Sequence, residues 1–333
     1  LVTTADNIIA IGNNALAKVT TSANSIAIGG FAGFGITGGQ NICIGHQTAY
    51  NTTSNTGHNN VLMGQVTAYS LTSGYENVCI GREVAYYLTT GFRNIFMGTY
   101  AGYASSSAKN TGNYNVGIGY NALRYVSSGS ENICIGYGCG ESITTGQRNV
   151  CLGRTAAQSI TSGSYNVCIG MQTGDSITTA NSNVFIGYQA GEKITTHAAN
   201  TFIGAQAGCY MTSGYNNVCL GHYAGASSGG GNYELYINSY VGSYGTDSFI
   251  YGNMNMASSP FLRVNGYLGI GCTPTCGLEL ANEASLKSGI KFGRYMAAGY
   301  RESFPSSGTY ASFSTDNHGS FTIGNNCHMD INN

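Results

Sequence analysis

Two carboxylates that face one sugar would make a glycosidase. Between residues 12 and 221 the chain has only six, namely Glu76, Glu83, Glu131, Glu141, Asp175 and Glu192. Glu131 and Glu141 are the candidates for such a pair, but we expect both to be ordinary solvated side chains. The sequence therefore predicts a protein that is not an enzyme and has no catalytic residues, with a carbohydrate-active (depolymerising) enzyme as an alternative.

Histidine and cysteine, the common metal ligands, show no metal-binding arrangement. The six histidines have no paired ligand spacing. Six of the eleven cysteines recur at one position of a repeat, namely Cys43, Cys79, Cys134, Cys151, Cys168 and Cys219. Since Ala and Phe also occur at this position, we expect buried thiols that act as small apolar groups. A metal-binding thiol stack, and a local disulfide between Cys272 and Cys276, are the alternatives. We predict no metal site and no cofactor.

Charge and hydropathy argue against nucleic acid and membranes as partners. The chain has 333 residues, of which only 8% are charged; 13 Lys and Arg balance 14 Asp and Glu. A nucleic-acid binder needs a basic surface, so we expect no nucleic acid. No apolar run reaches the ~18 residues of a membrane helix, so we expect no membrane insertion by this segment. Because it begins at Leu1 without a charged-then-apolar leader, we expect a piece of a longer protein.

These side chains are positioned by a short sequence repeat, in which Asn is followed by an apolar residue, any residue, a second apolar residue and Gly. Its asparagines are Asn41, Asn60, Asn77, Asn94, Asn115, Asn132, Asn149, Asn166, Asn183, Asn200 and Asn217. Its glycines are Gly45, Gly64, Gly81, Gly98, Gly119, Gly136, Gly153, Gly170, Gly187, Gly204 and Gly221. Two earlier copies end at Gly12 and Gly29, which makes thirteen repeats with a usual period of 17 residues. A fixed period of this kind indicates a stacked architecture.

Each repeat is expected to form one coil that contains a short strand. The three residues before each glycine place apolar side chains on both faces of the strand, a pattern typical of a parallel sheet that is buried on both sides. A turn such as Thr72-Ser73-Gly74 follows, and nothing in the array has a convincing helical period. We therefore predict an all-β protein, a parallel β-solenoid of about thirteen 17-residue coils. The repeated asparagine is expected to form a ladder, and the glycine to close each coil.

The chain is expected to divide into three parts. Residues 1–225 form the solenoid repeat array, residues 226–275 a β-rich boundary or cap segment, and residues 276–333 a small β-rich stalk or module. In the array, Glu76 and Arg93 share a column in neighbouring coils, as do Glu131 and Arg148, and opposite charges on adjacent strands support this register.

The second apolar face of the strands needs a cover, because a continuous apolar stripe is an interaction surface. Another copy of the chain is the simplest cover, so we predict an intertwined homotrimer; a lone solenoid with a broad interior is the alternative. Tyrosines just after the glycines are expected outside, where they suit sugar stacking. The candidate glycan-contact surface consists of Tyr100, Tyr120, Tyr137, Tyr188 and Tyr223.

Rows of threonine allow a further interpretation. Thr72, Thr89, Thr144 and Thr161 belong to a column that recurs once per coil. Regular threonine rows on a flat face would suit ice binding, but these precede a glycine bend, so turn formation is the favoured interpretation.

The Asn-apolar-x-apolar-Gly coils, together with the segment from Leu262 to Gly271 that follows them, resemble a known group. They are similar to the head repeats of trimeric autotransporter adhesins and to repeats of phage and virus tail fibres and spikes. The resemblance implies a trimeric, fibrous attachment protein on the virion surface or outside the cell. The tyrosine surface adds cell-surface glycan as a candidate partner. A self-assembling extracellular filament and a solenoid enzyme are the alternatives.

Overall fold

The computed structural model describes residues 7–19, 24–51, 55–226, 230–238, 250–254, 261–264, 268–270 and 278–280. The chain forms two compact units, Leu1–Gly266 and Tyr267–Asn333. Within the described ranges every regular element is a strand. The predicted all-β fold and parallel solenoid of about thirteen coils are therefore confirmed.

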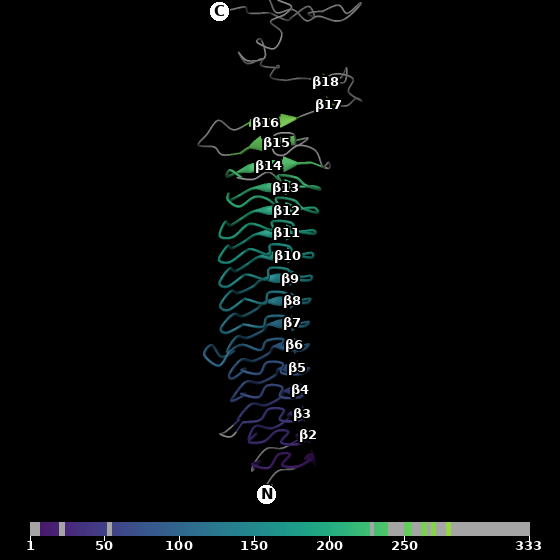
Figure 1. The fold of residues 1–333 in the computed structure, drawn as a ribbon, viewed down its shortest axis with the longest axis vertical. Coiled ribbons are helices and arrows are strands. Elements are labelled where there is room, and N and C mark those ends of the chain that lie inside the picture. Colours follow the sequence, from purple (N-terminus) through teal and green to yellow (C-terminus); the bar gives the residue numbers. More distant parts are fainter. Residues whose placement is uncertain are drawn as a thin grey trace, which may run out of the picture. The chain divides into compact units, whose positions relative to one another are not determined.

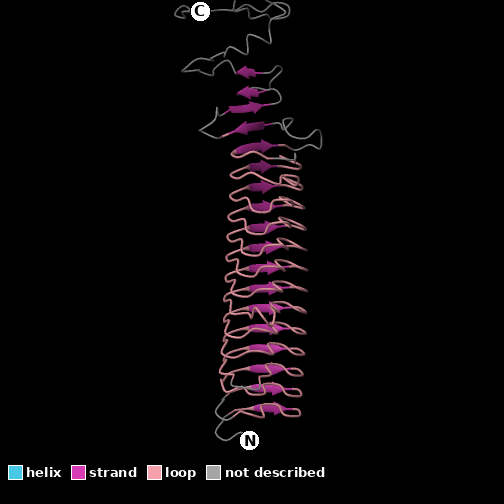
Figure 2. Ribbon diagram, turned by 60° about the vertical axis from the view of Figure 1, so that its left-hand side comes forward, coloured by secondary structure: helices cyan, strands magenta, loops and turns pink. Residues whose placement is uncertain are grey.

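The first unit contains sixteen short strands. They are β1 (Ile9–Ile11), β2 (Ile26–Ile28), β3 (Ile42–Ile44), β4 (Val61–Met63), β5 (Val78–Ile80), β6 (Ile95–Met97), β7 (Val116–Ile118), β8 (Ile133–Ile135), β9 (Val150–Leu152), β10 (Val167–Ile169), β11 (Val184–Ile186), β12 (Thr201–Ile203), β13 (Val218–Leu220), β14 (Glu234–Ile237), β15 (Ile250–Asn253) and β16 (Phe261–Val264). They form one sheet in sequence order, with one strand from each coil (Figures 1 and 2). In the second unit, β17 (Leu268–Ile270) pairs in parallel with β18 (Leu278–Leu280).

The parallel stack continues one coil beyond the last motif expected from the sequence. β14 pairs with β13 in parallel, with Leu235 opposite Val218, and only β15 and β16 reverse to antiparallel pairing. Glu234 and Asn238 stand in this coil where the others have Asn and Gly. Most of residues 226–333 lie outside the described residues, so the predicted boundaries at 225 and 275 stay predictions.

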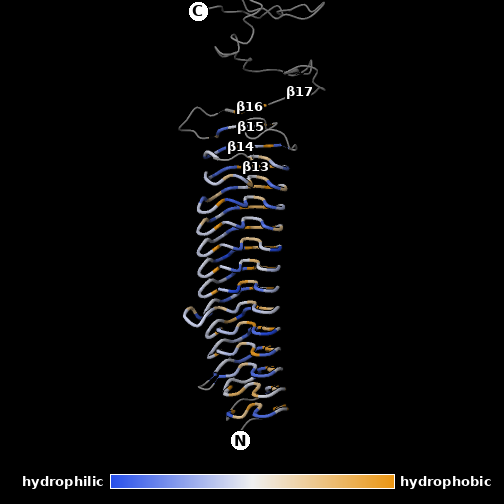
Figure 3. Tube along the Cα trace, viewed as in Figure 1, coloured by the Kyte–Doolittle hydropathy of each residue, from blue (hydrophilic) through white to orange (hydrophobic). Residues whose placement is uncertain are grey.

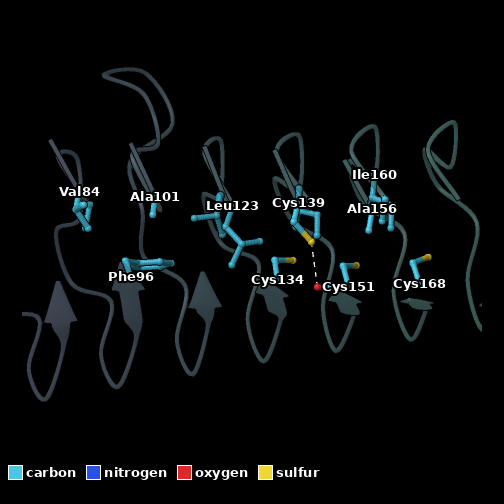
Figure 4. Packing of buried hydrophobic residues seen from close by; sticks show 14 of the residues in the cluster. Val84, Phe96, Ala101, Leu123, Cys134, Cys139, Cys151, Ala156, Ile160 and Cys168 are labelled. Carbon is cyan, nitrogen blue, oxygen red and sulfur yellow. Dashed lines mark hydrogen bonds between the residues drawn. The ribbon is translucent and has the colours of Figure 1, made fainter. Parts of the chain in front are cut away.

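The core is a column of side chains from the middle of each strand. The middle residue of β2 to β13 points into the coil and is buried, while its neighbours on the strand are at least partly exposed. Apolar segments accordingly recur at the same place in successive coils (Figure 3), and the buried residues of neighbouring coils pack in rows (Figure 4). Each strand thus contributes a single residue to the core, so the core of a coil is narrow.

Residues on the opposite wall of the coil compensate for volume in this column. Phe185 and Phe202 fill the strand position, and Gly191 and Gly208 stand six residues later. A Cβ on Gly191 would lie 2.6 Å from the Phe185 ring, and one on Gly208 would lie 2.4 Å from the Phe202 ring. Of the six coils with Cys in the strand, three have Ala at this position, as in the pair of Cys151 and Ala157, and three have Gly. Because interiors are close-packed, the largest side chain in the strand position requires the smallest residue on the opposite wall.

The backbone at the coil-closing position requires glycine. Gly153 has φ +139, and a Cβ there would lie 2.4 Å from the carbonyl oxygen of Gly170 in the next coil. Neither the dihedral nor the space suits another residue. The repeated glycine therefore lets neighbouring coils approach closely at the bend after the strand.

Candidate functional site

The repeated asparagines form a buried hydrogen-bond ladder along the stack. Nδ2 of each asparagine donates to Oδ1 of the asparagine one coil before, from the pair of Asn60 and Asn41 to that of Asn200 and Asn183, at 2.9–3.2 Å. The backbone N–H of the same residue donates to the same oxygen. The second Nδ2 hydrogen reaches a carbonyl of the following coil, as from Asn149 to Gly163. Every polar atom of these amides is therefore paired although the side chains are fully buried.

Glu234 closes the ladder. Its backbone N–H donates to Oδ1 of Asn217 at 2.8 Å, in the place where another asparagine would stand. Its carboxylate accepts from the N–H of Gly231 (3.0 Å) and the hydroxyl of Tyr236 (2.6 Å). Burial and this carboxylate raise the pKa of Tyr236. A glutamate with its own partners thus ends the amide ladder where the antiparallel strands begin.

The outward side of the strands carries an aliphatic stripe. We use this name for Ile42, Ile44, Val61, Met63, Val78, Ile80, Ile95, Met97, Val116, Ile118, Ile133, Ile135, Val150, Leu152, Val167, Ile169, Val184, Ile186, Ile203, Val218 and Leu220. These side chains flank the buried central residue of each strand and remain partly exposed; Ile133 is 38% exposed and Ile135 40%. Two in-register columns, apolar except for Thr201, therefore run along eleven coils without a cover within the described chain.

The candidate carboxylates Glu131 and Glu141 have separate partners. Glu131 accepts from Nε and Nη2 of Arg148 at 2.9 and 3.2 Å, and this guanidinium lowers the pKa of the carboxyl. Arg148 also donates to the hydroxyl of Tyr165. Glu76, Arg93 and Tyr114 repeat the same arrangement three coils earlier. Glu131 and Glu141 thus bond to different partners, and each carboxylate takes part in its own set of hydrogen bonds between neighbouring coils.

Glu141 belongs to a different cluster, assembled from neighbouring coils. Its Oε1 accepts from Nδ2 of Asn121 (3.1 Å) and lies 3.6 Å from Nη1 of Arg124. Its Oε2 accepts from Nε2 of Gln158 (2.8 Å). The Arg124 guanidinium lies 5.4 Å from the ring centre of Tyr100 and 5.1 Å from that of Tyr125.

Three of the five candidate glycan-contact tyrosines form one chain of contacts. The rings of Tyr100 and Tyr120 are edge-to-face at 6.0 Å, and those of Tyr120 and Tyr137 stack at 5.2 Å. Tyr188 is exposed three coils further along, and Tyr223 packs against the ring of His222. The structure therefore gathers Tyr100, Tyr120 and Tyr137 and leaves Tyr188 and Tyr223 apart.

The sequence reasoning missed a second aromatic column. The rings of Phe34, Tyr50, Tyr69, Tyr86 and Tyr103 follow one another along five coils at 4.9–5.4 Å. Each stands five residues after a coil-closing glycine, so aligning the repeats on that glycine would have revealed the column. Burial, and to a lesser extent neighbouring tyrosines and Glu83, raise the pKa values of Tyr86 and Tyr103.

The cysteine thiols are buried in the coils, and threonine hydroxyls form hydrogen bonds between coils. Eight cysteines of the described residues are free and buried, and burial raises the pKa of Cys43 to about 12. The pair Cys272 and Cys276 lies outside the described residues. The hydroxyls of Thr72, Thr144 and Thr161 donate to carbonyl oxygens of the next coil. These hydroxyls thus join the turns of neighbouring coils.

Among the residues that the structure describes, no three His, Cys, Asp or Glu side chains are grouped so as to hold a metal ion. The same part of the chain has no helix that is long and apolar enough to span a membrane.

The geometry defines the class of the protein as a parallel β-solenoid repeat protein. Comparison of the chain with protein-family models, curated proteins and solved structures found no match.

Proposed function

We propose that this protein is a non-enzymatic structural fibre or spike that attaches a virion or cell to a surface. The aliphatic stripe carries this proposal, and the asparagine ladder gives it further support. The ladder and the sheet connect every coil to the next by paired hydrogen bonds, so the array resists bending and local opening. Such a rod is suited to a mechanical role outside a cell or on a virion surface, the localisation we propose.

The stripe carries the argument for self-association. Monomeric soluble proteins rarely leave long contiguous apolar patches exposed, so a patch of two columns over eleven coils marks an interface. We propose that it is covered by two further copies of the chain in a homotrimer. Three copies related by an axis parallel to the stack would turn their stripes toward that axis. Glycan recognition would then use the tyrosines and arginines that lie away from the trimer axis, such as Tyr120, Tyr137 and Arg124.

The trimer is tested by the mass of the folded chain in solution, measured by light scattering after size exclusion. We expect three chain masses and rods of one length in electron micrographs. One chain mass would overturn the trimer, and rods that lengthen with concentration would instead identify the filament alternative.

A pair of substitutions locates the interface. Ile135→Asp places a charge on the stripe and should shift the mass toward one chain, because a buried unpaired charge is unfavourable. Thr145→Asp, on an exposed turn of the next coil, is the matched control and should leave three chain masses. Equal behaviour of the two variants would remove the stripe from the interface.

A further inference from the structure

One exposed arginine beside the aliphatic stripe has no partner in its own chain. Arg154 lies two residues after β9, and its side chain has no ion pair, hydrogen bond or ring contact within the part of the chain that the structure describes. The other four arginines of the array each lie 2.6–3.6 Å from a carboxylate oxygen, namely Arg82, Arg93, Arg124 and Arg148. The guanidinium of Arg154 is therefore available to a carboxylate of another molecule.

Arg154 belongs to one of two columns of residues that border the stripe. We call the residues two positions before each strand the entry column and those two positions after it the exit column. Only the buried ladder asparagine separates the first column from the stripe, and only the coil-closing glycine separates the second. The charged members, all exposed, are Glu76, Arg93, Glu131 and Arg148 in the entry column and Arg82 and Arg154 in the exit column. An apolar centre with a polar border is the usual anatomy of a protein interface.

In the proposed homotrimer, each copy turns one border of its stripe toward the next copy. Cyclic symmetry brings the exit column of one copy to the entry column of its neighbour. A pure rotation about an axis parallel to the stack leaves every coil at its own height. Residues of the two columns that belong to the same coil are then level with each other. Arg82 of one copy is thus level with Glu76 of the next, which has the opposite charge.

Glu131 has capacity for a second arginine. Its oxygens accept one hydrogen bond each from Arg148, at 2.9 and 3.2 Å, and its side chain is 46% exposed. Since a carboxylate accepts about four hydrogen bonds, a second donor fits on the open side. Arg154 is level with Arg148 and one coil away from Glu131, a step of about 4.8 Å that is shorter than an extended arginine side chain. The carboxylate of one copy then lies between its own Arg148 and Arg154 of the next copy.

The stripe alone does not fix how the copies align. Its two columns contain nearly the same residues in every coil, so copies that are shifted by one coil would bury a similar apolar surface. Charged pairs at the border of an interface contribute to alignment more than to affinity. A one-coil shift that made Arg82 level with Arg93 would replace an attractive pair with two like charges.

We propose that Arg154 of one copy binds Glu131 of the next, that Arg82 binds Glu76 in the same way, and that these pairs align the copies coil by coil. The inference rests on the trimer of the proposed function and names the side chains that set its register. Because the border of an interface stays accessible to water, Tyr137 in the exit column remains open to a ligand.

The test is crosslinking of the full chain with a water-soluble carbodiimide, which joins an amine to a carboxylate only where the two are in contact. Arg154→Lys keeps the positive charge and supplies the amine. Within one copy, Glu131 and position 154 lie on opposite sides of a strand, roughly 15 Å apart by the strand rise of about 3.3 Å per residue, so their product can only join two copies. We expect covalent dimers and trimers on a denaturing gel, and a peptide by mass spectrometry that links position 154 to Glu131.

Two further variants control the assignment. Adding Glu131→Gln to Arg154→Lys removes the carboxylate and should lower the yield of this peptide at least tenfold. Tyr188→Lys places the amine in the same exit column two coils further along, level with Ser182 in the entry column, and should give no link to Glu131. Equal linking from position 188, or crosslinked multimers that lack the peptide joining position 154 to Glu131, would overturn the register.

Light scattering of the same variants separates this inference from the proposed function. Three chain masses without the expected peptide would refute the pairing of Arg154 with Glu131 alone. One chain mass would overturn the trimer and this pairing with it.

Discussion

Nδ2 of Asn149 donates to Oδ1 of Asn132 at 2.9 Å, and the two residues stand at the same place in successive coils. Oδ1 of Asn149 in turn accepts from the backbone N–H and Nδ2 of Asn166, both at 3.0 Å. Every amide thus depends on the coil before it and the coil after it. The ladder is directional, since each oxygen faces the following coil, and it ends at the backbone N–H of Glu234.

Asn149→Ala should therefore destabilise the array strongly. It leaves Oδ1 of Asn132, the carbonyl of Gly163, and the N–H and Nδ2 of Asn166 each short of a partner. Because unpaired buried groups are costly, we expect a loss of about 2–4 kcal/mol in the free energy of unfolding, measured by urea denaturation. Gln147→Ala, on the exposed turn of the same coil, should change it by less than about 0.5 kcal/mol. Similar losses in both variants would contradict the role of the ladder.

The pairing of Phe185 with Gly191 predicts a compensating double substitution. Gly191→Ala alone should destabilise by about 1–3 kcal/mol, because the new Cβ would lie 2.6 Å from the Phe185 ring. Adding Phe185→Cys reproduces the combination of Cys151 and Ala157, whose alanine has φ 53. We expect the double variant to recover most of the loss in thermal or urea unfolding. Additive losses in a double-mutant cycle would show that the two positions do not share one volume.

The strand positions and the asparagine column could be predicted because a period repeated thirteen times averages out local exceptions. The coil of β14 was missed, since Glu234 and Asn238 replace both marker residues while the alternation of Leu235, Tyr236 and Ile237 persists. The cluster around Glu141 was missed for another reason. Asn121 and Glu141 are 20 residues apart, and their contact depends on how side chains leave turn positions, which the strand pattern does not specify.

The buried thiols predict resistance to alkylation. The thiolate is the reactive form, and burial raises the pKa of Cys43 to about 12 and excludes the reagent. In the native chain at pH 8, iodoacetamide should leave Cys43, Cys79, Cys134 and Cys151 unmodified over hours, whereas in denaturant all should react within minutes. Peptide mass spectrometry locates the label. Rapid native labelling of Cys43 or Cys151 would show that the coils open far more often than the paired ladder allows.

The same thiols predict lower stability in alkali. In the unfolded chain Cys43 has an ordinary thiol pKa of about 9, and in the folded chain its pKa is raised to about 12. Between these values the unfolded state has lost a proton that the folded state keeps, so the free energy of unfolding falls as pH rises. It should be constant up to about pH 8 and decline from pH 8.5 to 10.5, as measured by urea unfolding at each pH. Cys43→Ala, which places at this position the residue found in β2, should reduce the slope; an identical slope would assign the alkaline sensitivity to other groups.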